Sequence, residues 1–126
     1  MESVSLLESG DFKLYFNEEK STLEIDLNGL YTGKFKEEFE KKLNECLQNI
    51  NSSESIVVIE CHDNVTFSAA MLPLLEECMK ICGDFKRTYI LNAVNCICKL
   101  QFEKVIKNLG ISHKFKYVES KDEIII

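Results

Sequence analysis

The sequence of 126 residues contains little glycine and almost no proline, with five glycines and one proline, and it has no tryptophan. Such a composition excludes collagen-like and proline-rich low-complexity proteins. No run of about 18 apolar residues is present, so no membrane span is predicted. The first ten residues contain two acids and no base, whereas a secretory signal begins with basic residues. We therefore expect a cytoplasmic protein.

Basic residues are fewer than acidic residues. The chain has 15 lysines and arginines against 21 acidic residues, which gives a formal net charge of -6. Binding to nucleic acid depends on clustered Lys and Arg, so no nucleic-acid partner is predicted. The hydrophobic share of 45% and the charged share of 29% are typical of a globular protein. The length predicts a single domain over residues 1–126.

Motifs that carry catalytic chemistry are missing as well. The sequence has no glycine-rich phosphate loop, no nucleophile elbow and no paired-carboxylate signature. Cys61, His62 and Asp63 are consecutive, but neighbouring residues at the end of a strand point to opposite faces. The Cys61 thiol and the His62 imidazole should therefore point in opposite directions and cannot act as a nucleophile and its base. For these reasons no enzyme is predicted.

The six cysteines do not follow a familiar metal-binding spacing. Cys78 and Cys82 are four residues apart, which places them on one helix face, and Cys96 and Cys98 are two apart. Neither pair has the two-residue gap of a zinc knuckle. A site built from both pairs is geometrically conceivable, but buried thiols that pack as small apolar groups are the favoured interpretation. No metal and no cofactor are predicted.

What the sequence does contain is clear hydrophobic periodicity. Apolar residues alternate in some segments, which predicts strands, and recur every three or four residues in others, which predicts helices. The segment 62–67 is expected to be a loop, and the pattern leaves open whether the apolar tail Ile124–Ile126 packs against the protein. The predicted order is strand 11–16, strand 22–28, helix 35–50, strand 55–61, helix 70–82, strand 87–92, helix 97–109 and strand 114–118.

Several residues predict where these helices begin and end. Thr32 is expected to cap the first helix. Pro73 has no amide to donate and is tolerated only in the first turn, so the second helix should begin near Ala69 or Ala70. Gly110 is expected to end the third helix in the left-handed conformation. Alternation of helices and strands after an initial hairpin predicts a mixed sheet with helices packed on it.

Three short segments at matching positions in this order carry a resemblance to a known family. They are Leu27-Asn28-Gly29 before the first helix, Val65-Thr66-Phe67 before the second, and Leu109-Gly110-Ile111 at the end of the third. Together with the element order they resemble STAS domains (sulphate transporter and anti-sigma-factor antagonist) over about residues 11–118. The resemblance implies an α/β, STAS-like fold with a mixed sheet in the order β-β-α-β-α-β-α-β.

The resemblance breaks down at the family's phosphorylation motif. The stretch Asp-Ser-Ser/Thr-Gly that opens the second helix in the family corresponds to Ser68-Ala69-Ala70-Met71. The phosphoacceptor position is therefore degenerate at Ala70, or at Met71 if the register shifts by one. Ser68 and Thr66 are the nearest hydroxyls. Ser68 is a weak candidate for a shifted phosphosite, and a helix cap is the favoured interpretation.

The resemblance implies a non-enzymatic protein-interaction module of bacterial signalling and regulation, similar to an anti-sigma-factor antagonist and not regulated at the usual serine. The implied partner is an anti-sigma kinase-like or other regulatory protein, and a homodimer stays open. The alternative is a small-ligand or lipid-binding STAS-like subunit of a transport complex. The apolar start of the second helix is consistent with either a contact surface or core. The expected docking residues are Asp63, Asn64, Thr66, Phe67, Ser68, Ala69, Ala70, Met71 and Leu72.

Overall fold

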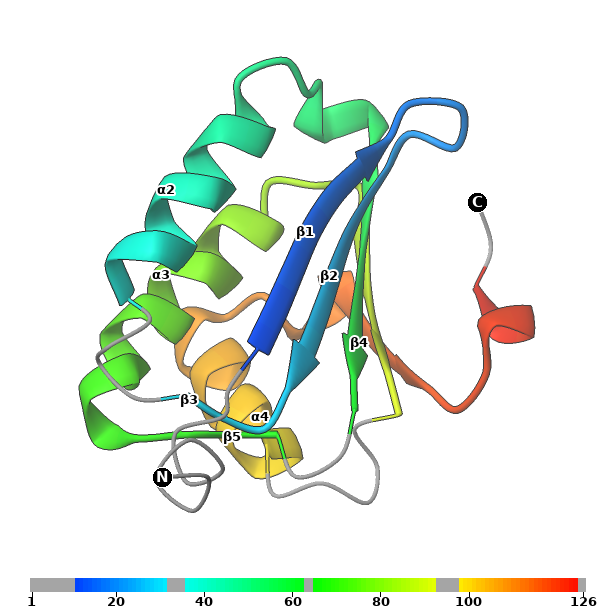
Figure 1. Cartoon of the computed structure of the whole chain (residues 1–126). Coiled ribbons are helices and arrows are strands. Elements are labelled where there is room, and N and C mark those ends of the chain that lie inside the picture. Colours follow the sequence, from blue (N-terminus) through cyan, green and yellow to red (C-terminus); the bar gives the residue numbers. More distant parts are fainter. Residues whose placement is uncertain (1–10, 32–35, 63–64, 93–97, 125–126) are drawn as a thin grey trace.

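The computed structural model describes residues 11–31, 36–62, 65–92 and 98–124 (Figure 1). Five strands form one mixed sheet in the order β1-β2-β4-β6-β7. The pair β1–β2 is antiparallel, and each later neighbour is parallel. This arrangement confirms the predicted hairpin and the predicted mixed sheet. The strands are β1 (Asp11–Asn17), β2 (Thr22–Asn28), β4 (Ile56–Cys61), β6 (Arg87–Leu91) and β7 (Phe115–Val118).

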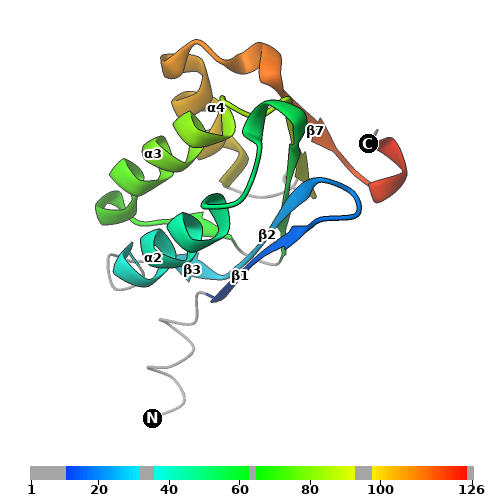
Figure 2. The same ribbon diagram turned by 90° about the horizontal axis from the view of Figure 1, so that it is seen from above.

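Three helices of the described ranges cover the same face of this sheet (Figure 2). They are α2 (Lys36–Leu47), α3 (Leu72–Cys82) and α4 (Cys98–Leu109). The parallel strands advance in one direction across the sheet, so right-handed crossovers must place every connecting helix on one side. The main core lies between these two layers, where Ile25 and Ile59 of the sheet pack with Phe39, Met79 and Phe102 of the helices.

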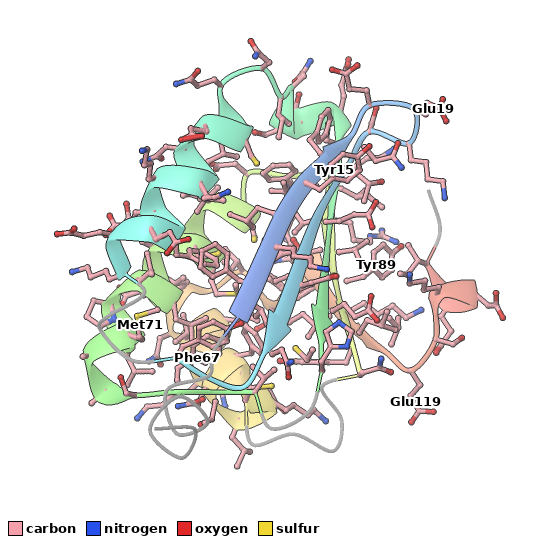
Figure 3. All side chains as sticks on the ribbon, in the orientation of Figure 1. Tyr15, Glu19, Phe67, Met71, Tyr89 and Glu119 are labelled. Atoms are coloured by element: carbon pink, nitrogen blue, oxygen red, sulfur yellow. The ribbon has the colours of Figure 1, made fainter. Side chains whose placement is uncertain are left out.

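The opposite face is partly covered by the C-terminal tail, and we call it the tail face. Its apolar cluster consists of Ile56, Tyr89, Leu91 and Val118, with Val58 and Ile124 packed against it. Tyr89 points from β6 toward the tail (Figure 3). The first isoleucine of the terminal triplet therefore packs on the protein, whereas Ile125 and Ile126 lie outside the described residues.

A second, two-stranded sheet was not predicted. It pairs β3 (Leu30–Tyr31) with β5 (Thr66–Phe67) in parallel. The prediction of a loop over residues 62–67 is therefore wrong at its last two residues. A strand of two residues is too short to show alternation. The chain leaves the main sheet at Gly29, whose φ of 79° is a conformation that glycine adopts readily, and β3 then pairs with β5.

The start of α3 differs slightly from its prediction. A tight 3₁₀ turn covers Ala69–Met71, and the regular α-helix begins at Leu72. An α-helix starting at Ala69 would need an amide at position 73 to bond the Ala69 carbonyl, and Pro73 has none. That carbonyl instead accepts from the amide of Leu72, one residue earlier.

The other predicted ends agree with the structure to within a few residues, which is usual for helix boundaries. Gly110 has a φ of 70°, as predicted for the residue that ends α4. Thr32, the predicted cap of α2, lies outside the described residues, as does Cys96. Within the described ranges, no helix has the length and apolar character needed to cross a membrane.

Candidate functional site

The expected docking residues divide between the surface and the core. Ala69, Ala70 and Leu72 are exposed, with Leu72 exposed by 38%. Phe67 and Met71 are buried in the main core (Figure 3). The expectation that these two side chains meet a partner is therefore corrected. Met71 packs into the core between the sheet and the helices, while Ala70 and Leu72 face solvent. Asp63 and Asn64 lie outside the described residues.

The segment that leads into α3 is held by a side chain that the sequence did not single out. The Gln101 Nε2 group of α4 donates to the Phe67 carbonyl at 2.8 Å, and the Phe67 amide donates to Gln101 Oε1 at 3.0 Å. The Thr66 hydroxyl is 3.5 Å from the same oxygen. Gln101 thus bonds the free edge of β5 as a neighbouring strand would, and β3 bonds the other edge. We call this arrangement the Gln101 latch.

Aromatic rings support the latch from the core side. The Tyr31 and Phe67 rings are stacked with centroids 5.6 Å apart, and Phe67 meets Phe102 edge to face at 5.7 Å. The Tyr31 hydroxyl accepts the amide of Asn28 at 2.8 Å. Such ring pairs contribute beyond the apolar area they bury. The exposed apolar residues at the start of α3 therefore sit on a rigid base.

Ser68 occupies the capping position but does not make the capping bond. Its backbone carbonyl accepts from the Met71 amide at 2.9 Å, whereas its side chain makes no cap hydrogen bond. The Ser68 Oγ atom is buried and has no hydrogen-bond partner among the described residues. The predicted side-chain cap is therefore wrong, because the hydroxyl points inward. A buried hydroxyl is also poorly placed to receive a phosphate.

Four of the five described cysteines are buried, and Cys46 is partly buried. A hydrogen bond with Cys78, together with burial, raises the pKa of the Cys82 thiol well above its ordinary value of 9.0. Burial raises the pKa of Cys46, and the neighbouring Glu45 adds to the effect. A nucleophilic cysteine needs a lowered pKa, so these two thiols are not activated. Cys61 is buried and His62 is exposed, so their predicted divergence is confirmed.

An apolar cavity of about 20 Å³ lies between the sheet and helices α2 and α3. Its walls are core side chains, among them Ile25, Phe39 and Met79. A space of this size has room for about one water molecule, whereas ligand pockets usually measure about 300–1,000 Å³. Within the described residues, this cavity offers no preformed space for an acyl chain.

The strand order, the single antiparallel edge and the helices on one face together define a STAS-like fold, the fold of anti-sigma-factor antagonists. The predicted fold class is confirmed. A solved structure with this arrangement is an uncharacterized protein of the DUF3478 family from Shewanella loihica PV-4, described as having a SpoIIAA-like fold. It aligns with a TM-score of 0.59 and 20% identity over 90% of this chain and 89% of that chain.

No protein-family model and no curated protein sequence matches the chain. The likeness to the solved structure is thus one of fold. The sequence motifs and the exposed residues at the start of α3 must carry any argument about function.

Proposed function

We propose that this chain is a non-enzymatic protein-interaction module that resembles an anti-sigma-factor antagonist and docks a regulatory protein, such as an anti-sigma kinase-like protein, through the start of α3. The observation that carries the proposal is the exposed apolar run Ala69, Ala70 and Leu72 on the base held by the Gln101 latch. Exposed apolar residues on a rigid surface are typical of interaction sites.

A further exposed leucine lies at the start of α4, whose Gln101 contacts β5. Leu100 is exposed by 71% and precedes Gln101, whose side chain bonds to Phe67 in β5. The first turn of α4 therefore lies beside the segment that enters α3. We define the docking surface as Ala69, Ala70 and Leu72, and we propose that a large partner also covers Leu100. Exposed leucines cost free energy in water, and a partner that covers them regains it.

The proposal includes a surface that is not switched by phosphorylation at the usual serine. Ala70 has no hydroxyl, and the Ser68 hydroxyl is buried. A phosphate at a helix start would add close to two negative charges and repel or reshape a partner. Without an acceptor there, the docking surface stays in its unmodified shape, and control of binding would depend on the amount of the protein or on its partner.

The test is a pull-down from a lysate of the source organism with wild-type protein, Ala70→Glu and Gln48→Glu as baits. Gln48 is exposed and lies after α2, away from the docking surface, so this variant adds the same charge elsewhere. We expect a regulatory protein bound by wild type and Gln48→Glu and weakened about tenfold or more by Ala70→Glu. Met71→Glu is unsuitable, because it would place a charge in the core.

Two outcomes would contradict the proposal. A partner bound equally by Ala70→Glu would place the interface elsewhere. No specific partner from folded baits, together with a small molecule that co-purifies in native mass spectrometry, would favour the ligand-binding or lipid-binding subunit instead. The intact mass of the recovered wild-type bait shows whether it carries a phosphate, and we expect that it carries none.

A further inference from the structure

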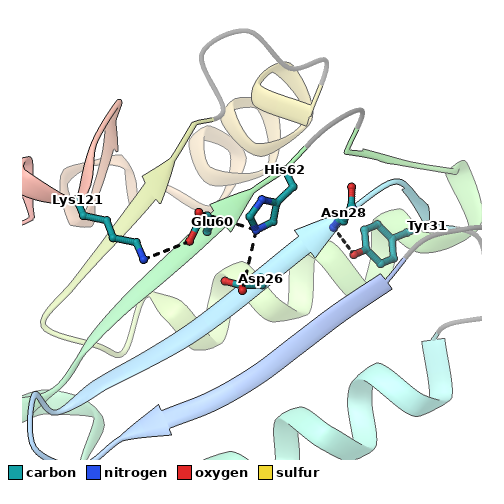
Figure 4. Close-up of polar contacts among 6 residues, drawn as sticks. All are labelled: Asp26, Asn28, Tyr31, Glu60, His62 and Lys121. Carbon is teal, nitrogen blue, oxygen red and sulfur yellow. Dashed lines mark hydrogen bonds and ion pairs between the residues drawn. The ribbon is translucent and has the colours of Figure 1, made fainter.

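Three polar side chains converge on the tail face of the sheet, away from the docking surface. His62 Nε2 lies 4.0 Å from Asp26 Oδ2 and 3.9 Å from Glu60 Oε2 (Figure 4). One nitrogen and two carboxylate oxygens from this group all lie within 4.8 Å of one another. We call Asp26, Glu60 and His62 the carboxylate–histidine cluster.

Sheet register explains why these residues meet. Asp26 and Glu60 are directly paired across the parallel strands β2 and β4. Their neighbours in each strand, such as Ile25 and Ile59, are buried in the helix-side core, so alternation turns both carboxylates to the tail face. The His62 amide donates to the Leu27 carbonyl at 2.8 Å. This bond continues the ladder one residue beyond β4 and places the imidazole on the side of Glu60.

The donor set and its geometry suit a metal ion. Imidazole is a good ligand for divalent transition metals, and carboxylates complete many such sites. Ligand atoms on one tetrahedral ion lie about 3.3 Å apart when each bond is about 2.0–2.1 Å. The observed distances of 3.9 and 4.0 Å would need to shorten by about 0.6 Å, which small side-chain rotations can supply.

We propose that the carboxylate–histidine cluster binds one divalent transition-metal ion through Asp26, Glu60 and His62, with water at the remaining positions. The side chains of Asp26 and His62 are exposed by 41% and 44%, so solvent reaches the ion. A hollow beside the cluster is lined by Asp26, Asn28 and His62 together with residues of β1. The function proposed for the docking surface does not depend on this site.

Lys121 links the cluster to the C-terminal tail. Its Nζ atom lies 3.8 Å from Glu60 Oε1, the carboxylate oxygen that does not face His62. A bound cation would repel this ammonium group and compete with it for Glu60. Metal binding should therefore weaken the contact between the tail and Glu60. Removal of the Lys121 charge should in turn strengthen metal binding.

Titration of the full chain with Co²⁺, followed by calorimetry and by NMR of the imidazoles, tests the proposal. The chain has two histidines, so paramagnetic broadening at His62 and not at His113 would locate the ion. We expect one site whose affinity falls about tenfold or more in Asp26→Asn, Glu60→Gln and His62→Gln. Because these side chains are partly exposed, their replacement should leave the fold intact, and circular dichroism checks this.

Control variants separate this site from other sources of binding. His113→Gln, Glu76→Gln and Ala70→Glu should change the affinity by less than about twofold, and Lys121→Ala should raise it about two- to fivefold. The proposal would be overturned by an absence of saturable binding below millimolar Co²⁺. It would equally be overturned by affinity that survives the three ligand substitutions, or by the strong near-ultraviolet absorption of thiolate-bound cobalt, which would assign the ion to cysteines.

Discussion

Gln101 is a half-buried polar residue that stabilises the loop entering α3. Its amide group is bonded on both sides to the backbone of Phe67, 34 positions earlier in the chain. Buried or half-buried backbone groups that lose their partner cost more free energy than a typical hydrogen bond contributes. The effect of Gln101 on stability should thus exceed that of its exposed neighbours.

Replacement of Gln101 by alanine should lower the free energy of unfolding by about 1–3 kcal/mol, because the amide and the carbonyl of Phe67 both lose their partner. Urea denaturation measures this, and hydrogen exchange at the Phe67 amide should become faster. Gln101→Glu keeps the acceptor and removes the donor, so it should lower the free energy of unfolding by less than Gln101→Ala does. The exposed Lys104→Ala is the matched control, with a change within about 0.5 kcal/mol. An equal effect at both positions would argue against the latch.

Among the elements, helix α4 shows how a local signal fixes a boundary. Gly110 follows the last helical residue with a φ of 70°. Its amide donates to the Lys107 carbonyl at 3.1 Å, and the Ile111 amide donates to the Ile106 carbonyl at 3.3 Å. These two bonds form a Schellman motif. The turn directs Ile111 back onto the core beside Gly83, so the motif also sets the path into β7.

We expect Gly110→Ala to lower the free energy of unfolding by about 1 kcal/mol, because a side chain is strained in the left-handed conformation. The space around this glycine is open, so crowding should add nothing. Gly110→Asn should cost less, since asparagine tolerates this conformation better. Urea denaturation of the three proteins gives the comparison. If alanine and asparagine were equivalent, backbone strain would not be the cause.

For the whole molecule, the helix-covered face of the sheet carries most of the burial and most of the thiols. The pKa of Cys82 is raised by its hydrogen bond with Cys78 and by burial, and the pKa of Cys46 is raised by burial. Burial also raises the pKa of Tyr117, with a further contribution from Glu103. The folded protein thus holds these protons more tightly than the unfolded chain does. This difference makes stability depend on pH.

The contribution of these groups to the free energy of unfolding is fully present below the ordinary thiol pKa of 9.0. It should be lost as the pH rises above this value, because the unfolded chain then releases protons that the folded chain retains. Urea denaturation from about pH 7 to about pH 10.5 should show the free energy of unfolding fall above about pH 9. Cys82→Ala should be less stable at neutral pH and show a shallower fall. Identical slopes in both proteins would contradict this assignment.

The sequence by itself determined the five strands of the main sheet, the three helices and the end of α4. Alternation, helical periodicity and the glycine at position 110 are local signals, and they act over a few neighbouring residues. The resemblance through Val65-Thr66-Phe67 likewise located the segment that enters α3. Pro73 indicated a late helix start, although the 3₁₀ turn before it became visible only in the structure.

Only the tertiary structure decided which residues of that segment face outward. Met71 and Phe67 are buried and Ala70 is exposed, a choice made by how the segment packs on α4 and the sheet. The Gln101 latch joins residues 34 positions apart, and the carboxylate–histidine cluster depends on the register between β2 and β4. The sequence pattern specified each strand, but which side chains of β2 and β4 stand opposite each other depends on how these two distant segments pair in the folded sheet.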